Sequence, residues 1–506
     1  MAARGILTWR QAGTGANLIG RLALGLERLA LAAFIITILL LGYWRAIPLS
    51  WFSQSWAVSS QYQLVTLFNP QYRAIILYPS DIAAAVTITL CLLGRIAASI
   101  TRQERAPLRF GPLYLMLPVI GMAALSALSA TQAVLPILSL EIALHLLFLA
   151  ALVIAIINLR PPLWAVAAPL ALLLAIEGLL SLLQTLAQST LLGPLLFNWS
   201  HNITAAQPEA SIVQLPDGTR WLRAYGSLPH PNILGGLLCL AIPVVAGSYL
   251  RLPRRSLAAG WRAWLLLISL GLGLLALLLS FSRAAWLGVF IAALWAGLLL
   301  WQRRRVARHQ PPVSSFAPQN TSLHLSEAAR RLAFLCLLGA GLLVSLVATL
   351  GPAIQSRLLL SNSTLEQRSL SERAILLEAG ATFFTQHPWL GVGAGNMPLV
   401  ELSYPPTRNI GESTHNVPIA IAVETGLFGM LLWLLPPIVT LWYTWERRFA
   451  LSAAGLAASV ALIALSIVAQ LDHYLWTQPT GSLIWWLAVT LVALWSERSS
   501  NEATIH

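Results

Sequence analysis

His415 and Asn416 stand directly before a long apolar run, in the stretch STHNVPIAIAVETGLFG at residues 413–429. An imidazole has an unperturbed pKa of about 6.5, so its neutral form can accept a proton near neutral pH, as a general base does. A polar ring at the mouth of a hydrophobic segment is costly unless something uses it. The residues alone leave two interpretations open: a base, or a cap on the helix that follows.

Arg283 lies in the stretch FSRAAWLG, which joins two apolar runs with almost no loop between them. A guanidinium at such a membrane boundary costs up to about 2.5–3.5 kcal/mol, and less if its end reaches the interface. One interpretation is contact with lipid phosphates. The other is a specific anion site, because the planar guanidinium donates two parallel hydrogen bonds to phosphate oxygens.

The chain offers few groups for metal or nucleotide chemistry. Its only aspartates are Asp81, Asp217 and Asp472, and the sequence has no Walker-type loop, HExxH zinc motif or GxSxG nucleophile motif. Each of the three cysteines lies inside an apolar run, which argues against disulfides and metal clusters. We therefore predict no metal and no cofactor, with arginines stabilising any diphosphate leaving group by fixed positive charge.

The composition requires a membrane protein. With 57% hydrophobic and 10% charged residues and a mean hydropathy of +0.73, the chain has too little polar surface to cover a water-soluble globule. Runs of about 20 apolar residues cross the hydrocarbon core as helices. We predict an all-α polytopic transmembrane bundle of about twelve spans. The predicted spans are 25–45, 82–100, 112–132, 136–158, 163–186, 229–250, 263–281, 284–301, 332–352, 417–442, 449–470 and 480–496.

Arginines concentrate in every second loop between these spans. By the positive-inside rule those loops, and both termini, are predicted to be cytoplasmic. The positions of the arginines in these loops explain the net charge of +13 through membrane topology, so we expect no nucleic-acid partner. The chain is predicted to be a single integral membrane domain over residues 1–506, with 302–331 as a flexible cytoplasmic linker rich in Pro, Ser and Gln.

Two long segments, 187–228 and 353–416, fall on the opposite side, which is the outer face of the plasma membrane in this topology. Loops held by a rigid scaffold commonly carry chemistry. Within the second, residues 371–386 begin with a serine and an acidic residue and have apolar positions at helical spacing. This pattern predicts a capped amphipathic helix on the membrane surface, followed by a glycine-rich turn and by the catalytic end of the segment.

Four stretches carry a family resemblance: RAYGSLPHPNILGGLL at 223–238, LLLSFSRAAWLG at 277–288, SERAILLEAGATFFTQHPWLGVGAGNM at 371–397 and THNVPIAIAVETGLFG at 414–429. In this order, on about twelve spans, they resemble the O-antigen ligase and polymerase superfamily of membrane glycosyltransferases. The resemblance implies transfer of a glycan from an undecaprenyl-pyrophosphate carrier to an acceptor hydroxyl at the outer face, without metal. The implied partners are the lipid-linked glycan donor, a glycan or lipid acceptor, and membrane lipids.

The resemblance also implies residue roles. His415 matches the family's general base, and Asn416 is placed to orient the ring or the acceptor. Arg283 and Arg373 best match its phosphate-binding arginines. Arg223 is a weaker third match, with bracing of its loop as the alternative. Arg368 lies close enough to Arg373 that either of the two could be the phosphate ligand.

The remaining polar residues receive plainer interpretations. Glu141 with His145, and Glu177 with Gln184, share helix faces and are expected to be structural, although Glu177 could line a donor cavity. Glu424 is expected to be a buried polar group where helices pack closely. We do not expect the pair Asp472-His473 to face the site. No chemistry is assigned to three further histidines, His201, His230 and His387.

Other functions fit the same outline. A polymerase of this superfamily would share the motifs and differ only in its acceptor. A secondary transporter or lipid flippase would show repeated halves and helices interrupted at the midplane, and the two halves of this sequence show no repeat. A structural partner in a cell-envelope assembly would not need His415. Glycan transfer by the purified protein would distinguish a glycosyltransferase from a transporter and from a structural partner.

Overall fold

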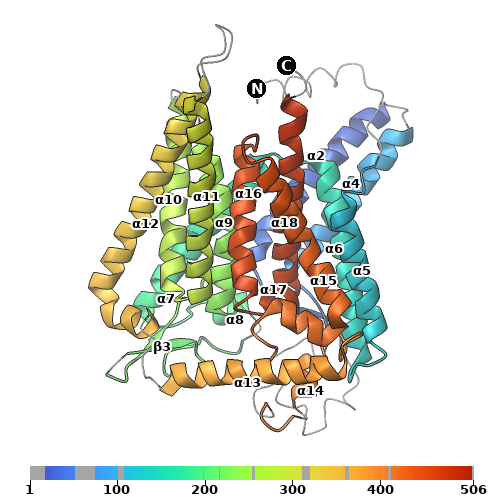
Figure 1. The fold of residues 1–506 in the computed structure, drawn as a ribbon, viewed down its shortest axis with the longest axis vertical. Coiled ribbons are helices and arrows are strands. Elements are labelled where there is room, and N and C mark those ends of the chain that lie inside the picture. The colour runs from blue at the N-terminus through green and yellow to red at the C-terminus, as the bar shows by residue number, and fades with distance from the viewer. Residues whose placement is uncertain are drawn as a thin grey trace.

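The computed structural model describes residues 18–51, 74–100, 108–197, 199–215, 217–252, 257–309, 320–358, 364–402, 404–407 and 412–503. Most of these residues lie in long helices that run side by side along one direction (Figure 1). The predicted all-α polytopic class is therefore confirmed, and strands are confined to two short two-stranded sheets within the described residues.

Each of the twelve predicted spans coincides with a helix. Among the described residues, ten helices are long and apolar enough to cross a membrane, and α5 and α16 are shorter apolar helices of 17 residues each. The twelve are α2 (Leu18–Leu39), α4 (Pro79–Ile100), α5 (Leu113–Ser129), α6 (Pro136–Leu159), α7 (Leu163–Ala187), α9 (Pro231–Leu250), α10 (Leu257–Leu279), α11 (Arg283–His309), α12 (Asn320–Leu358), α15 (Val417–Glu446), α16 (Ala453–Ala469) and α18 (Pro479–Ala503).

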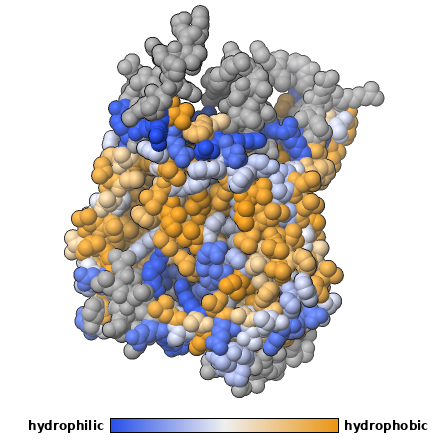
Figure 2. Space-filling model, in the orientation of Figure 1, coloured by the Kyte–Doolittle hydropathy of each residue, from blue (hydrophilic) through white to orange (hydrophobic). Residues whose placement is uncertain are grey.

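The helices differ sharply in how much of their surface other helices cover. In their apolar windows, 94% of the α18 residues and 83% of the α9 residues are buried, against 6% for α12. α9 packs against α7, α10, α11 and α16, so it forms the centre of the bundle. An apolar belt covers the middle of the visible face between two polar ends (Figure 2), as expected for helices surrounded by lipid chains.

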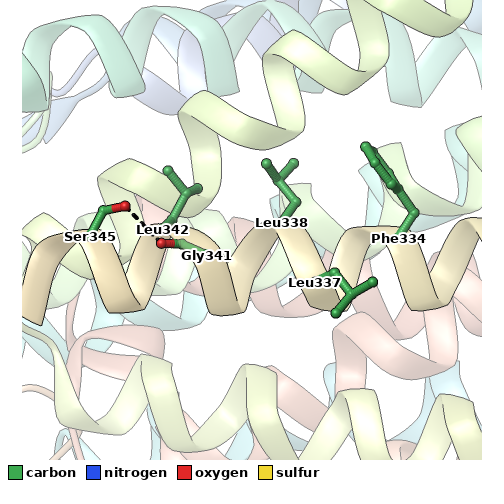
Figure 3. A pocket seen from close by; sticks show the side chains of 6 residues that line it. All are labelled: Phe334, Leu337, Leu338, Gly341, Leu342 and Ser345. Carbon is green, nitrogen blue, oxygen red and sulfur yellow. Dashed lines mark hydrogen bonds between the residues drawn. The ribbon is translucent and has the colours of Figure 1, made fainter.

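An open groove that is apolar except for one serine runs along α12, where Leu338 faces Gly271 of α10 (Figure 3). It is lined by Phe334, Leu337, Leu338, Gly341, Leu342 and Ser345. The Ser345 hydroxyl donates to the Gly341 carbonyl at 2.9 Å, so this hydroxyl is satisfied within its own helix. A groove of this kind at bilayer depth suits lipid chains.

The two ends of the bundle carry different structures. α2 begins, and α18 ends, at the same end, where α11 leads toward α12 and α15 toward α16 (Figure 1). At the opposite end α13 (Thr364–Gln386) lies across the bundle, near the hairpin of β3 (Ile212–Gln214) and β4 (Arg220–Leu222). The described parts of the segments predicted to face outward are thus at the end away from the start of α2 and the end of α18.

Several predicted boundaries were wrong. The surface helix begins at Thr364, and Ser371 lies inside it with its hydroxyl bonded to the Arg368 carbonyl, so Ser371 is not the cap. α11 and α12 continue into the segment 302–331, which was predicted to be a flexible linker; its residues 310–319 lie outside the described part. Arginine, alanine and leucine favour helix, and this propensity extends the spans beyond their apolar parts.

The sequence interpretation also missed short elements. β1 (Ile47–Trp51) pairs antiparallel with β2 (Ala74–Leu77) between the first two spans. The outer segments further contain α8 (Gly193–Leu196), α14 (Met397–Glu401) and α17 (Tyr474–Thr477). A single-turn 3-10 helix, η1 (Leu40–Gly42), follows α2. Elements of three to five residues give no recognisable periodicity.

Candidate active site

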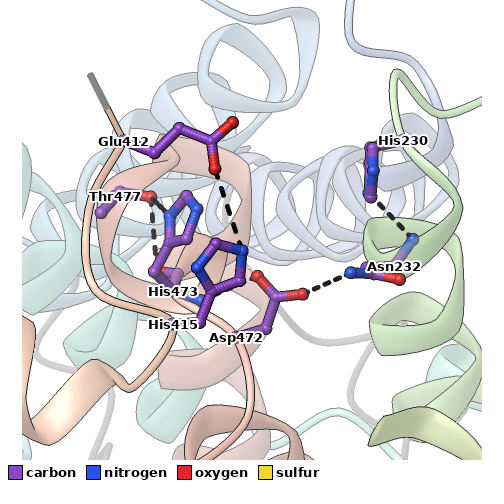
Figure 4. A network of polar contacts seen from close by, with 7 residues as sticks. All are labelled: His230, Asn232, Glu412, His415, Asp472, His473 and Thr477. Atoms are coloured by element: carbon purple, nitrogen blue, oxygen red, sulfur yellow. Dashed lines mark hydrogen bonds and ion pairs between the residues drawn. The ribbon is translucent and has the colours of Figure 1, made fainter. Parts of the chain in front are cut away.

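A chain of polar side chains lies at the end of the bundle that carries α13 (Figures 1 and 4). The rings of His415 and His473 meet edge to face, with centroids 5.0 Å apart and an interplanar angle of 88°. The Asp472 carboxylate lies beside them and accepts hydrogen bonds from the His473 backbone N–H at 2.8 Å and from Asn232 Nδ2 at 2.7 Å. Segments separated by 240 positions in the sequence thus form one cluster.

Arg223 extends this chain. One of its terminal nitrogens donates to Asn232 Oδ1 at 2.6 Å, and its Nε donates to the Ser280 carbonyl at 2.9 Å. The side chain is only 5% exposed. Arg223, expected to be the weakest of the arginine matches, is therefore linked to Asp472 through a single intervening side chain, Asn232.

Asn416 acts as the N-cap of α15. Its Oδ1 accepts from the Ile419 backbone N–H at 3.0 Å, and its Nδ2 donates to the backbone carbonyl of Gln470 at 3.2 Å. The cap of this helix is therefore Asn416 and not His415, so the interpretation of His415 as a helix cap is wrong. The bond to Gln470 also ties the His415 backbone to the turn that carries Asp472.

The electrostatics keep the His415 ring neutral. Burial lowers the pKa of His415 to about 3; the neighbouring His473 and Arg373 act in the same direction, and Asp472 opposes them. Its Nδ1 is buried and has no hydrogen-bond partner among the described residues, while Nε2 lies 3.9 Å from an exposed Glu412 oxygen. For Asp472, burial would raise the pKa, but His415, His473, His230 and Arg373 bring it below its ordinary value.

His230, to which no chemistry was assigned, belongs to the same cluster. It caps α9, with Nδ1 accepting from the Asn232 backbone N–H at 3.1 Å. Burial and the Arg223 guanidinium lower the pKa of His230 to about 3. The sequence signal was available: a histidine followed by proline and asparagine marks the start of a helix, with Pro at the first helical position.

α13 separates the two candidate arginines of the surface helix. Leu376, Ala379 and Phe383 are buried at helical spacing against the bundle, and Arg373 lies one turn before them on the same face. Arg373 contributes to the electrostatic environment of both His415 and Asp472. Arg368 instead pairs with Glu372, its Nε 2.7 Å from a carboxylate oxygen, and its side chain is 75% exposed.

Arg283 begins α11 and is partly buried. Two residues earlier the chain turns sharply, with Phe281 at a positive φ of 49°, and the Ser280 carbonyl of this turn receives the bond from Arg223. α11 also approaches α9 closely, since a Cβ at Gly235 would lie 2.7 Å from Ala285. Arg283 therefore starts a helix packed directly against the helix that carries Asn232.

Glu177 and Gln184 brace the segment that holds Arg223. Glu177 accepts from the Ser227 backbone N–H at 2.8 Å and from the Ser227 hydroxyl. Gln184 Oε1 accepts from the backbone N–H groups of Tyr225 and Gly226, both at 2.9 Å. The structural interpretation of this pair is confirmed, because both side chains are buried and bonded to the backbone of this segment or to the Ser227 hydroxyl.

The glycine-rich turn after α13 serves as an anchor. Gly391, Gly393 and Gly395 all have positive φ, which residues with a Cβ rarely adopt. The turn packs against a break in α15 at Gly426, and Glu424 accepts from the Gly395 N–H at 2.9 Å and from Trp476 Nε1 at 2.7 Å. Glu424 is thus the buried polar group at a close contact that the sequence predicted, and it fixes α13 relative to the start of α15.

The remaining predicted polar residues lie elsewhere. His145 was expected to pair with Glu141, but its Nε2 lies 3.8 Å from an oxygen of Asp81 on α4, a partner that helical spacing alone could not identify. His201 is an exposed residue of the segment 187–228, with its Nε2 3.7 Å from Glu209.

The fold and the cluster define a polytopic helical membrane protein with a buried polar site at one end of its bundle. Residues 266–434 match the family model described as O-antigen ligase, and this match confirms the resemblance to the O-antigen ligase superfamily. The matched stretch contains Arg283, Arg373 and His415, whereas Arg223 and Asp472 lie on either side of it. No curated protein matches the chain.

Proposed function

We propose that the protein transfers a glycan from an undecaprenyl-pyrophosphate carrier to an acceptor hydroxyl at the outer face of the plasma membrane. The observation that carries this proposal is the pairing of a neutral, largely buried His415 with a hydrogen-bonded chain that runs through Asp472 and Asn232 to Arg223. A base and fixed cations in one cluster are what an inverting displacement of a diphosphate requires. The match to the O-antigen ligase family supports the same class of reaction.

The reaction forms one bond and breaks one. The acceptor oxygen attacks the anomeric carbon of the donor glycan, and the bond from that carbon to the diphosphate oxygen breaks. His415 takes the hydroxyl proton on Nε2, and the diphosphate leaves with the bonding electron pair. The Asp472 carboxylate stabilises the imidazolium that forms, because an opposite charge beside the ring favours its protonated state.

We assign different roles to the four arginines near the site. Arg373 and Arg283 are assigned to the diphosphate, where charge-assisted hydrogen bonds contribute about 1.5–3 kcal/mol each. Arg223 is already bonded to Asn232 and Ser280, so we assign it a positioning role in the cluster, with Asn232 between it and Asp472. Arg368 is assigned to the surface, as its exposure and its pairing with Glu372 suggest.

The low pKa of the free His415 is compatible with this role. A base that titrates near 3 is weak, but the empty site lacks the negative charges of the donor. A diphosphate near the ring raises the pKa of the imidazole, by roughly 1–3 units for an opposite charge within about 4–6 Å. Donor binding therefore strengthens the base at the stage when the acceptor arrives.

The test compares His415→Ala with His201→Ala, since His201 is an exposed histidine with a carboxylate at a similar distance. Donor-lipid binding and single-turnover transfer are measured in proteoliposomes. We expect His415→Ala to bind donor normally and to transfer about 10²–10⁴-fold more slowly, while His201→Ala behaves as the wild type. Normal transfer by the His415→Ala protein removes the base from the mechanism.

A further inference from the structure

Glu412, His415 and His473 form a compact set of metal-binding side chains. Each offers one ligand atom, and these atoms all lie within 4.8 Å of one another (Figure 4). His415 Nε2 and Glu412 Oε2 are 3.9 Å apart. Two of the residues come from the segment before α15 and the third from the turn between α16 and α18, so folding alone brings them together.

The orientation of His473 is set by a neighbour outside this set. Its Nδ1 lies 2.8 Å from the Thr477 hydroxyl, and that hydroxyl is itself 3.3 Å from the His473 carbonyl. When the hydroxyl donates to the carbonyl, it accepts from Nδ1–H, and the lone pair of the ring is then on Nε2. Metal-binding histidines are commonly held by a second hydrogen bond of this kind.

The donor atoms select the type of ion. Two imidazoles and one carboxylate are a ligand set of zinc sites that keep a fourth position open, whereas magnesium and calcium prefer oxygen ligands alone. Ligand atoms about 2.0–2.1 Å from a tetrahedral ion are about 3.3 Å from one another, so the present separations of up to 4.8 Å must contract when the ion binds. The Glu412 side chain is 57% exposed and precedes α15 in an irregular segment, and it can therefore supply that movement.

The charges near the cluster permit a cation. Glu412 and Asp472 are carboxylates, and Asp472 is held by Asn232 and by the His473 backbone N–H beside the two rings. Arg373 opposes them with one positive charge. Arg223 adds a second positive charge one side chain away from Asp472, so the two carboxylates balance the two guanidinium groups and the case for the ion rests on the three ligand atoms.

We propose that Glu412, His415 and His473 bind a zinc ion with an open fourth position, and that the bound ion inhibits glycan transfer by occupying the His415 lone pair. The inhibitory part rests on the proposed function, because it requires His415 to act as the base. The binding part is independent of it. Transfer itself needs no metal under this proposal, so zinc is a regulator of the site.

The binding arm uses the purified full-length protein and a chromogenic zinc chelator as competitor. The variants are Glu412→Gln, His473→Ala and the control His201→Ala. His201 also lies near a carboxylate, but among the described residues it belongs to no group of three metal-binding side chains. We expect one zinc ion per wild-type chain and an affinity loss of about 100-fold or more in the first two variants. No saturable zinc binding, or equal binding by the His473→Ala protein, overturns the site.

The activity arm measures transfer in zinc buffers of fixed free concentration. Glu412→Gln removes a ligand that has no part in the proposed reaction, and we expect it to transfer at the wild-type rate without zinc while inhibition requires about tenfold or more higher zinc. Zinc that binds as expected without slowing transfer overturns the inhibition, and so does transfer that is lost in chelator and restored by zinc. A protein that binds zinc but never transfers glycan contradicts the proposed function and leaves the binding result standing.

Discussion

Replacing Arg373 tests the assignment of the diphosphate site most directly. α13 carries two arginines five positions apart, and helical geometry places them on different faces. Arg373 lies on the face of the buried Leu376 and Ala379, whereas Arg368 is 75% exposed and bonded to Glu372. The matched pair of variants is therefore Arg373→Ala and Arg368→Ala, on one helix and with the same change in charge and volume.

The expected magnitudes differ widely. If Arg373 donates two charge-assisted hydrogen bonds to the diphosphate, at about 1.5–3 kcal/mol each, its removal costs about 3 kcal/mol or more in donor binding. At about 1.4 kcal/mol per tenfold change, donor affinity falls roughly 100-fold or more. An exposed ion pair contributes little, so Arg368→Ala should remain within about twofold of the wild type.

The assay measures donor-lipid binding and single-turnover transfer for both variants in proteoliposomes, with thermal unfolding as a check on the fold. Arg373→Ala should lose affinity for the donor as well as rate, because its bonds exist before and during the reaction. Equal losses in the two variants, or a loss confined to Arg368→Ala, would refute the argument from the buried face of α13.

Four further predictions follow from the same geometry. Asn232→Ala breaks the hydrogen-bonded chain at its centre and should slow transfer about 10–100-fold, the cost of one buried bond to a charged group, with donor binding much less affected. Lowering the pH protonates His415, but its lowered pKa should keep kcat/KM free of an acid limb near pH 6.5, while the limb in kcat lies higher because bound donor raises the pKa. Excess EDTA should leave transfer intact, and a loss reversed by magnesium or manganese would contradict the leaving-group chemistry. A cysteine near residue 357 should be labelled from outside intact cells and one near residue 305 should not, and the reverse pattern would invert the topology.

The helices could be predicted from the sequence because a membrane constrains them so strongly. A chain crossing the hydrocarbon core must satisfy its backbone hydrogen bonds internally, and about 20 apolar residues are needed to do so. All twelve runs are helices in the structure, although α5 and α16 fall short of full length. Helix ends were predicted less well. The surface helix was predicted to begin at residue 371, where its apolar pattern begins, but α13 begins at Thr364.

The site could be predicted only in part. His415, Asn416 and the arginine stretches could be singled out because they interrupt apolar sequence, and their roles in the reaction stay a prediction. Asp472 and Asn232 were not joined to them, since no local pattern connects residues 240 positions apart whose side chains meet at 2.7 Å. Asp472 nevertheless carried a weak signal, because aspartate is so rare in this chain that one placed next to an apolar span calls for a partner.

The placement of helix ends supports the proposal that the site handles a diphosphate without a metal ion. α9 begins after His230, α11 begins at Arg283 and α15 begins after Asn416, all at the end of the bundle that carries α13. A helix N-terminus carries about half a positive charge and unpaired N–H groups, so it favours an anion nearby. Close packing of α11 on α9, and the electrostatic coupling of His230 with His415, bring these three ends to one region. Helix ends and arginines are fixed before the reaction starts, and their positive charge therefore needs no reorganisation as negative charge develops on the leaving group.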